Sequence, residues 1–158
     1  MAAPAPQIQR IVLIGFSATG KSAVAHALAL HLGWTSIDTD DLIERTTARS
    51  VPDIFAHDGE PAFRALEREA AAQAATLPNT VVATGGGLWL DAANRAALCD
   101  GGFVVALEAR WDTILARHAS AESARPDARP LLAGPLASSN DPVQTVRRLK
   151  ASRQALYA

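Results

Sequence analysis

The segment GFSATGKS at residues 15–22 constrains what this chain can fold into more than any other part of its sequence. It follows a β-branched run, RIVLI at residues 10–14, and it precedes a helical pattern that ends at Gly33. A strand, a glycine-rich turn and a helix in this order form a cradle whose backbone N–H groups hold phosphate oxygens. Lys21 is expected to reach the β- and γ-phosphates, and Ser22 to ligate Mg²⁺. The motif therefore predicts a bound nucleoside triphosphate and leaves the acceptor of the phosphoryl group open.

Strand and helix patterns alternate along the rest of the chain, which predicts an α/β fold built on a parallel sheet. The predicted strands cover residues 10–14, 35–40, 80–84 and 102–108. The predicted helices cover residues 20–32, 51–59, 60–76, 92–98, 111–118 and a last segment from about 142. Gly15, the DTD of residues 38–40 and the three glycines 85–87 all fall at strand ends. Because ligands of such sheets bind outside the carboxyl ends of the strands, these residues are predicted to form one composite site.

Length and composition exclude several classes of protein. The 158 residues suit a single domain, and the net charge of −1 gives no basic surface for nucleic acid or an acidic membrane. Cys99 is the only cysteine, so no disulfide can form within the chain. The first nine residues lack the pattern of a signal peptide, and no apolar run approaches the roughly 18 residues of a membrane span. A cytoplasmic protein is expected.

Features that the chain lacks reduce the number of possible acceptors of the phosphoryl group. A regulatory GTPase needs an N-K-x-D guanine motif, and the only lysine besides Lys21 is Lys150 in LKAS. The chain is also shorter than the larger mechanical ATPases require. A small-molecule kinase remains, and such an enzyme needs an acceptor pocket.

Two groups of charged residues are candidates for that pocket. Asp38 and Asp40 flank Thr39, and on an extended strand both carboxylates would share a face and approach the phosphates together. One could hold Mg²⁺ through water while the other accepts a hydrogen bond from a substrate hydroxyl. The alternative is a polar strand end that caps the next helix, the interpretation preferred for Asp41. Arg64 lies three residues before Glu67 on a predicted helix, a spacing that by itself indicates a surface ion pair.

Six motifs follow one another in a recognisable order between residues 11 and 157: GFSATGKS, DTD, IFAHDGEPAFRALE, TGGG, RPLLAG and RQALY. In order and spacing they resemble the shikimate kinase family, whose members transfer a phosphoryl group from ATP to the 3-hydroxyl of shikimate in aromatic amino-acid biosynthesis. The resemblance implies a P-loop kinase fold over residues 1–158, with a parallel sheet sandwiched by helices and ATP and Mg²⁺ as cofactors. It divides the chain into the P-loop strand and helix (9–32), a small helical substrate-binding region (41–76) and a mobile lid (119–134). A monomer is expected.

The resemblance also implies a role for each matching residue. ATP would be bound by Gly15, Phe16, Ser17, Ala18, Thr19, Gly20, Lys21, Ser22, Arg117 and Arg129. Shikimate would be bound by Asp40, Arg64, Gly85, Gly86, Gly87 and Arg153, and Mg²⁺ by Ser22 and Asp38. Lys21, Asp40 and the lid residue Arg129 would be catalytic, with Asp40 as the base and Arg125 as a competitor of Arg129. Phe55 and Phe63 would wall the ring of the substrate or belong to the core.

Some features depart from the family or leave alternatives open. The family continues with a final strand and helix that the sequence does not contain, so four strands are expected where the family has five. A kinase for gluconate or a nucleoside monophosphate, or a nucleotide-binding protein without catalysis, would also fit the phosphate loop. The four histidines show no metal-ligand spacing and are expected at the surface or at helix ends. Trp34, Trp89 and Trp111 are expected to pack rather than to stack on a ligand.

Overall fold

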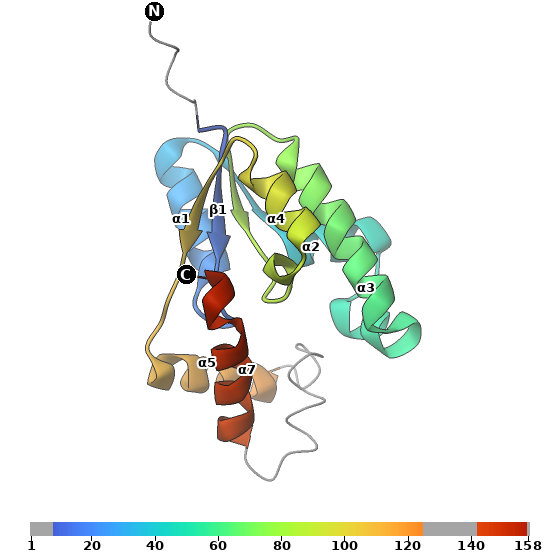
Figure 1. Ribbon diagram of the computed structural model, residues 1–158, viewed down its shortest axis with the longest axis vertical. Coiled ribbons are helices and arrows are strands. Elements are labelled where there is room, and N and C mark those ends of the chain that lie inside the picture. The colour runs from blue at the N-terminus through green and yellow to red at the C-terminus, as the bar shows by residue number, and fades with distance from the viewer. Residues whose placement is uncertain (1–7, 125–141, 158) are drawn as a thin grey trace, which may run out of the picture.

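The computed structural model describes residues 8–124 and 142–157 of the chain. Its elements, in chain order, are β1 (Arg10–Ile14), α1 (Lys21–Leu32), β2 (Thr35–Asp38), α2 (Thr39–Thr47), α3 (Val51–Ala75), β3 (Thr80–Ala83), the 3₁₀ turn η1 (Leu88–Leu90), α4 (Ala92–Cys99), β4 (Gly102–Ala106), α5 (Trp111–Ala124) and α7 (Pro142–Tyr157). Figure 1 shows them along the chain. Strands and helices alternate as the sequence predicts.

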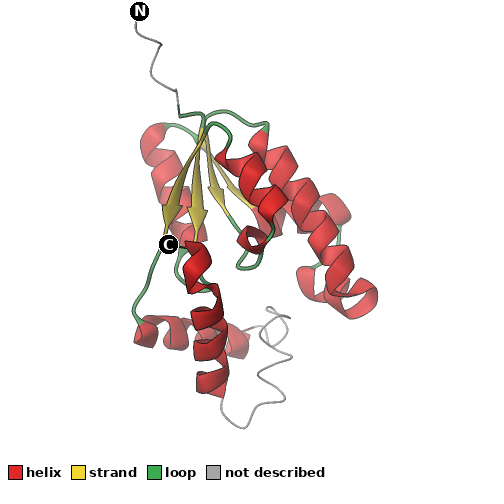
Figure 2. Cartoon of the chain, viewed as in Figure 1, coloured by secondary structure: helices red, strands yellow, loops and turns green. Residues whose placement is uncertain are grey.

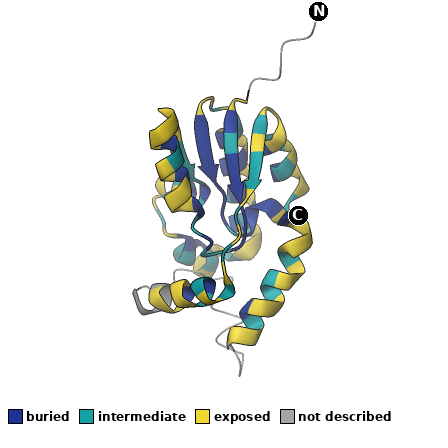
Figure 3. Ribbon diagram, turned by 90° about the vertical axis from the view of Figure 1, so that its left-hand side faces the viewer, coloured by how far each residue is buried: buried dark blue, intermediate teal, exposed yellow. Residues whose placement is uncertain are grey.

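The four strands form one parallel sheet in the order β2-β3-β1-β4. Because all four point the same way, their carboxyl ends lie at one edge of the sheet (Figure 2). The two central strands are almost fully buried, as Figure 3 shows, since helices cover both of their faces. The predicted α/β fold with a helix-covered parallel sheet is therefore confirmed, and the composite site belongs at the lower edge in Figure 1.

Three apolar clusters hold the helices in place. Alternate residues of β1 and β3 point to opposite faces, and one face packs against Ala25 and Ala29 of α1. The other face packs against buried residues of α3, α4, α5 and α7. A third, separate cluster joins α2 to α3 through Ile43, Ile54 and Phe63. This cluster gives the predicted helical region at residues 41–76 a small core of its own beside the sheet.

The second strand is shorter than predicted, and this changes the setting of the aspartates. β2 ends at Asp38, and Thr39 and Asp40 already belong to the first turn of α2. Asp38 is the N-cap of that helix, since its Oδ1 accepts a hydrogen bond from the N–H of Asp40 at 2.9 Å. The prediction that Asp38 and Asp40 share one face of an extended strand was wrong. The capping role expected of Asp41 belongs to Asp38, because an N-cap carboxylate satisfies free helix N–H groups.

The long helix α3 contains the break that the sequence places at its glycine. Ser50 caps its start, and Gly59 has the non-helical angles φ 79° and ψ 176°. The segments before and after Gly59 are therefore two helices joined at a kink, as predicted. Pro61 follows at once and lies in the first turn of the second segment, where a missing N–H costs nothing.

Two other predictions, both about the helix α5, were wrong. α5 continues to Ala124, so residues 119–124 are helical and do not belong to a loop. Residues 125–134 of the predicted lid, including Arg125 and Arg129, lie outside the described residues. His118 is 8% exposed and lies edge-on to the ring of Phe16 at 6.3 Å, so it is a buried residue. Among the described residues no helix combines the length and the apolar character that a membrane crossing needs.

Candidate active site

The phosphate loop joins the carboxyl end of β1 to the first residue of α1. Its first and last glycines have positive φ angles, 137° at Gly15 and 99° at Gly20, which side chains rarely tolerate. The N-terminus of α1 has no side-chain cap, so its free N–H groups remain available for an anion. Lys21 is 8% exposed, and its Nζ donates to the carbonyl oxygens of Gly15 and Phe16 at 2.9 Å each. The loop therefore closes around the buried ammonium group of Lys21.

Ser22 and Asp38 meet beside this loop. Ser22 Oγ donates to Asp38 Oδ2 at 2.5 Å, which joins the first turn of α1 to the end of β2. The other oxygen of Asp38 caps α2, so its side chain is fixed at both ends. A hydroxyl and a carboxylate oxygen are hard donors of the kind that Mg²⁺ prefers, and Mg²⁺ needs few protein ligands beside phosphates. This donor set fits a magnesium ion.

Asp40 is the most perturbed acid of the site. Its Oδ1 is shielded from solvent and has no hydrogen-bond partner among the described residues. A Cβ at Gly85 would overlap this carboxylate, so the glycine lets the backbone approach it. Burial raises the pKa of Asp40 to about 7, with further contributions from Asp38 and Glu67, and Lys21 opposes the rise. A carboxyl group with a pKa near neutrality can accept and return a proton at physiological pH.

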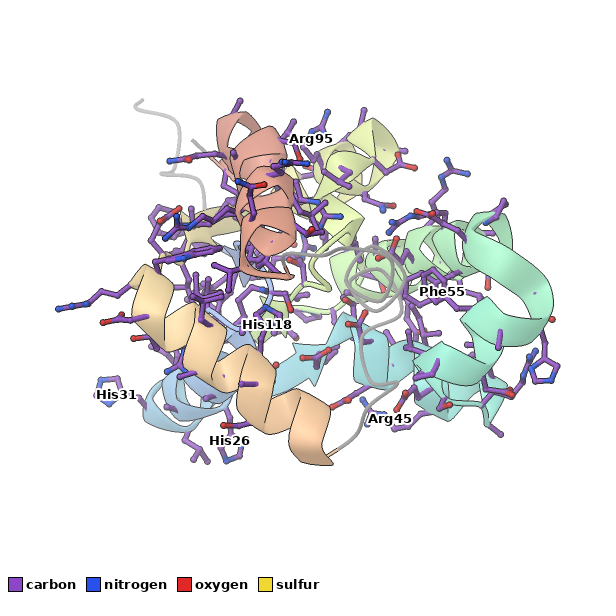
Figure 4. The ribbon with its side chains drawn as sticks, turned by 90° about the horizontal axis from the view of Figure 1, so that it is seen from below. His26, His31, Arg45, Phe55, Arg95 and His118 are labelled. Atoms are coloured by element: carbon purple, nitrogen blue, oxygen red, sulfur yellow. The ribbon has the colours of Figure 1, made fainter. Side chains whose placement is uncertain are left out.

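A cavity of about 360 Å³ connects the loop to these acids. It is lined by Ser17, Ala18, Gly20, Lys21, Ser22, Ala23, Asp38, Asp40, Thr84, Gly85, Gly86 and Arg117. Figure 4 views the molecule from this edge of the sheet, with His118 of α5 on one side and Phe55 of α3 on the other. A second cavity of about 550 Å³ is also lined by Ser22 and Asp38, together with residues such as His26 and Arg45. The first cavity carries the groups that chemistry on a phosphate needs.

Arg64 and Glu67 form a partly buried pair and not the surface pair that their spacing alone indicates. Glu67 is 2% exposed, and its Oε2 accepts from Arg64 Nη1 at 2.5 Å. Glu60 also accepts from Arg64, at 2.7 Å from Nη2. A Cβ at Gly87 would overlap the Arg64 guanidinium, so Arg64 lies against the glycine turn. Burial raises the pKa of Glu67, while Arg64 and Arg153 lower it.

Arg153 reaches the same turn from the last helix. Its Nη1 donates to the carbonyl oxygen of Gly86 at 3.2 Å, and the hydroxyl of Tyr157 donates to the same oxygen at 2.9 Å. The charge of Arg153 also acts on Glu67, which places it near the Arg64–Glu67 pair. Two guanidinium groups, from α3 and α7, therefore converge on the glycine turn.

The turn itself is fixed between the phosphate loop and α2. The N–H of Gly85 donates to Thr39 Oγ1 at 2.8 Å, and Thr39 is fully buried. A Cβ at Gly86 would lie 3.7 Å from Ser17 of the phosphate loop. Gly85 thus adjoins Asp40, and Gly86 adjoins Ser17 and Arg153. Gly87 adjoins Arg64. The run of three glycines therefore brings these groups to one short stretch of backbone.

The remaining sequence candidates take different places. Arg117 Nη1 donates to the carbonyl oxygen of Ala18 at 2.9 Å, so it lies over the phosphate loop. Phe55 and Phe63 contact each other with ring centroids 4.6 Å apart, and Phe63 is buried in the α2–α3 cluster. That burial supports the core interpretation for Phe63.

The sequence reasoning missed two residues that organise the site. Thr39 accepts the hydrogen bond from Gly85, and its position between Asp38 and Asp40 could have identified it. Tyr157 holds Gly86, and its signal was its spacing of four residues from Arg153, which puts both on one face of a helix.

A phosphate loop that opens a helix, beside an aspartate at a helix cap and a second aspartate with a shielded carboxylate oxygen, defines a small-molecule kinase of the P-loop class. A sequence profile for shikimate kinase matches residues 17–158. The shikimate kinase of Symbiobacterium thermophilum is 45% identical over 148 residues, covering 94% of this chain and 80% of that protein. The shikimate kinase of Moorella thermoacetica is 44% identical over 124 residues, covering 78% and 69%. The chain therefore belongs to the shikimate kinase family.

A solved structure agrees with this assignment. The shikimate kinase from Acinetobacter baumannii in complex with shikimate matches this fold with a TM-score of 0.82 at 34% identity. The match covers 96% of this chain and 79% of that one. The resemblance predicted from the ordered motifs, the P-loop kinase fold and the enzyme class are all confirmed.

Proposed function

We propose that this chain transfers the γ-phosphoryl group of ATP to the 3-hydroxyl of shikimate through the residues gathered around its glycine turn. The observation that carries this proposal is the order of contacts along the turn. Gly85 adjoins the Asp40 carboxylate, Gly86 accepts from Arg153, and Gly87 adjoins the Arg64 guanidinium. Three successive residues span at most about 7 Å between their outer Cα atoms. This matches a small ring acid whose hydroxyl and carboxylate lie on different ring carbons.

The two arginines would bind the acid group of the acceptor. A guanidinium can hold a carboxylate with two parallel hydrogen bonds, which fixes the orientation of the ring as well as its position. Glu67 anchors Arg64 from the buried side, so the guanidinium stays aimed at the turn. Phosphoryl transfer depends on alignment and charge neutralisation more than on covalent catalysis, so such positioning is a large part of the rate.

The other end of the acceptor would face Asp40. With its pKa raised to about 7, the carboxylate can accept the proton that leaves the attacking hydroxyl. Lys21 would exchange its carbonyl partners at Gly15 and Phe16 for the β- and γ-phosphates of ATP. When bound, Mg²⁺ neutralises charge on these phosphates, and Ser22 and Asp38 are the residues that would hold it. Arg129 in the lid, the cytoplasmic location and the monomeric state stay predictions from the sequence.

A coupled assay of ADP release tests the proposed acceptor. Wild-type protein is given ATP and Mg²⁺ with shikimate, with gluconate, or with no acceptor. Release that depends on shikimate supports the proposal. Release with gluconate alone would identify another acceptor, and ATP binding without acceptor-dependent release would indicate a non-catalytic protein. Lys21→Met serves as the control that must lose release in every arm.

A further inference from the structure

The Arg64 guanidinium is shared by two carboxylates that differ in exposure. Glu67 is 2% exposed and binds Nη1 at 2.5 Å. Glu60 is 54% exposed, and its Oε1 accepts from both Nε and Nη2, at 3.2 and 2.7 Å. Arg64 itself is 22% exposed, so its outer side reaches solvent. The Glu67 carboxylate is therefore buried with the fold, and the Glu60 carboxylate lies on the solvent-exposed side of the guanidinium.

Glu60 binds the two N–H groups of Arg64 that are best placed to hold a carboxylate. Nε–H and one N–H of Nη2 point in parallel along one side of the guanidinium plane, the arrangement that holds a carboxylate with two hydrogen bonds. Glu60 occupies this pair in the free protein. An incoming carboxylate that uses the same pair must first displace it.

The local backbone explains why Glu60 stands there. The non-helical angles of Gly59 end one helical segment, and Glu60 begins the next, four residues before Arg64. Side chains at this spacing are neighbours on one helix face. Because an exposed ion pair of this type is weak, Glu60 can turn into solvent at little cost, whereas Glu67 cannot.

The balance of charges around the glycine turn also favours the exchange of Glu60 for a carboxylate ligand. In the free protein, Arg64 pairs with Glu60 and Glu67, and the charge of Arg153 acts on Glu67, so two guanidinium groups and two carboxylates offset one another. With Glu60 turned into solvent, one positive charge is uncompensated and a carboxylate ligand restores the balance. With Glu60 in place, the same ligand would add a third negative charge.

We propose that Glu60 is an internal competitor that occupies the carboxylate-binding side of Arg64 and is displaced when the acid group of the acceptor binds. This inference rests on the proposed function, since it takes shikimate as the acceptor. Glu60 thereby raises the KM for the acceptor and leaves the reacting end of the site, at Asp40, unchanged. It is a residue that sets affinity and not a catalytic residue.

The test compares Glu60→Gln with Glu69→Gln, which removes the same charge from an exposed position on the same helix. The KM for shikimate should fall about twofold to fivefold in Glu60→Gln, the range expected for loss of an exposed ion pair, with kcat unchanged. Glu69→Gln should leave both constants unchanged. Titration calorimetry with shikimate and no ATP should show the same gain in affinity, and shikimate methyl ester should show none.

Two kinds of result would overturn the proposal for Glu60. A KM that is unchanged or raised in Glu60→Gln would overturn the proposal, because Glu60 would then be indifferent or would help to orient Arg64. An equal gain in Glu69→Gln, or a gain for the ester, would reduce the effect to general electrostatics and also overturn it. If the wild-type protein neither binds nor phosphorylates shikimate, the proposed function fails instead, and the two failures are thus distinguishable.

Discussion

The buried carboxyl group of Asp40 should make the protein less stable as pH rises, and Asp40→Asn should remove this loss. The pKa of Asp40 is about 7 in the folded protein, against 3.8 as its ordinary value. Since the folded state holds the proton more tightly than the unfolded state, stability falls between pH 3.8 and 7 and stays low above. The sign is opposite to that of a carboxylate stabilised by an ion pair.

The magnitude follows from the two pKa values. Linkage gives a penalty of about 2 kcal/mol at pH 5 that grows to about 4 kcal/mol at pH 8. Asparagine has nearly the same shape and no charge, so Asp40→Asn should be more stable than wild type by up to these amounts. Its advantage should vanish below about pH 4, where both states of the wild-type group are protonated.

Urea unfolding followed by circular dichroism at several pH values between 4 and 8 measures this difference. Asp100→Asn is the matched control, because it removes one carboxylate from an exposed position. A stability difference for Asp40→Asn that does not change with pH would show that the Asp40 carboxyl group does not have a raised pKa in the folded protein. So would a variant less stable than wild type at pH 8, since the carboxylate would then be stabilised by its surroundings.

Three further substitutions test the acceptor side of the site. Gly87→Ala should raise the KM for shikimate by about tenfold or more, as steady-state kinetics would show, because the new Cβ would overlap the Arg64 guanidinium. Arg153→Lys should raise the same KM by about tenfold, since an ammonium group cannot form the paired hydrogen bonds of a guanidinium; an unchanged KM would remove Arg153 from the binding site. Tyr157→Phe should lower the free energy of unfolding by about 1 kcal/mol through loss of its bond to Gly86 and should weaken shikimate binding in calorimetry. Normal binding there would mean that Tyr157 does not position Arg153.

The parts of the fold that the sequence predicts are those set by local chemistry. The β-branched run before Gly15, the glycine loop and the start of the helix after it are each specified by adjacent residues. The kink at Gly59 is likewise local, because only glycine readily adopts its backbone angles. The order of motifs then indicated the site, since strand ends of a parallel sheet meet at one edge.

The parts that were missed depend on competition between neighbours in space. Asp40 falls on a helix because Asp38 caps that helix, and a strand pattern cannot show which of three aspartates will do so. Glu67 is 2% exposed on a helix that packs against α4 and the 3₁₀ turn η1, and the spacing from Arg64 does not reveal this packing. His118 is 8% exposed and lies against the ring of Phe16, a contact between residues about a hundred positions apart that local sequence cannot show.

The identity of the product after a single turnover tests the proposed reaction and its acceptor hydroxyl together. Wild-type protein in excess is mixed with shikimate, Mg²⁺ and ATP, and phosphorus-31 and carbon-13 NMR locate the transferred group. We expect one product, phosphorylated on the 3-hydroxyl, formed with one equivalent of ADP and nearly absent with Asp40→Asn. Phosphate released to water, or attached to another hydroxyl of shikimate, would contradict this expectation.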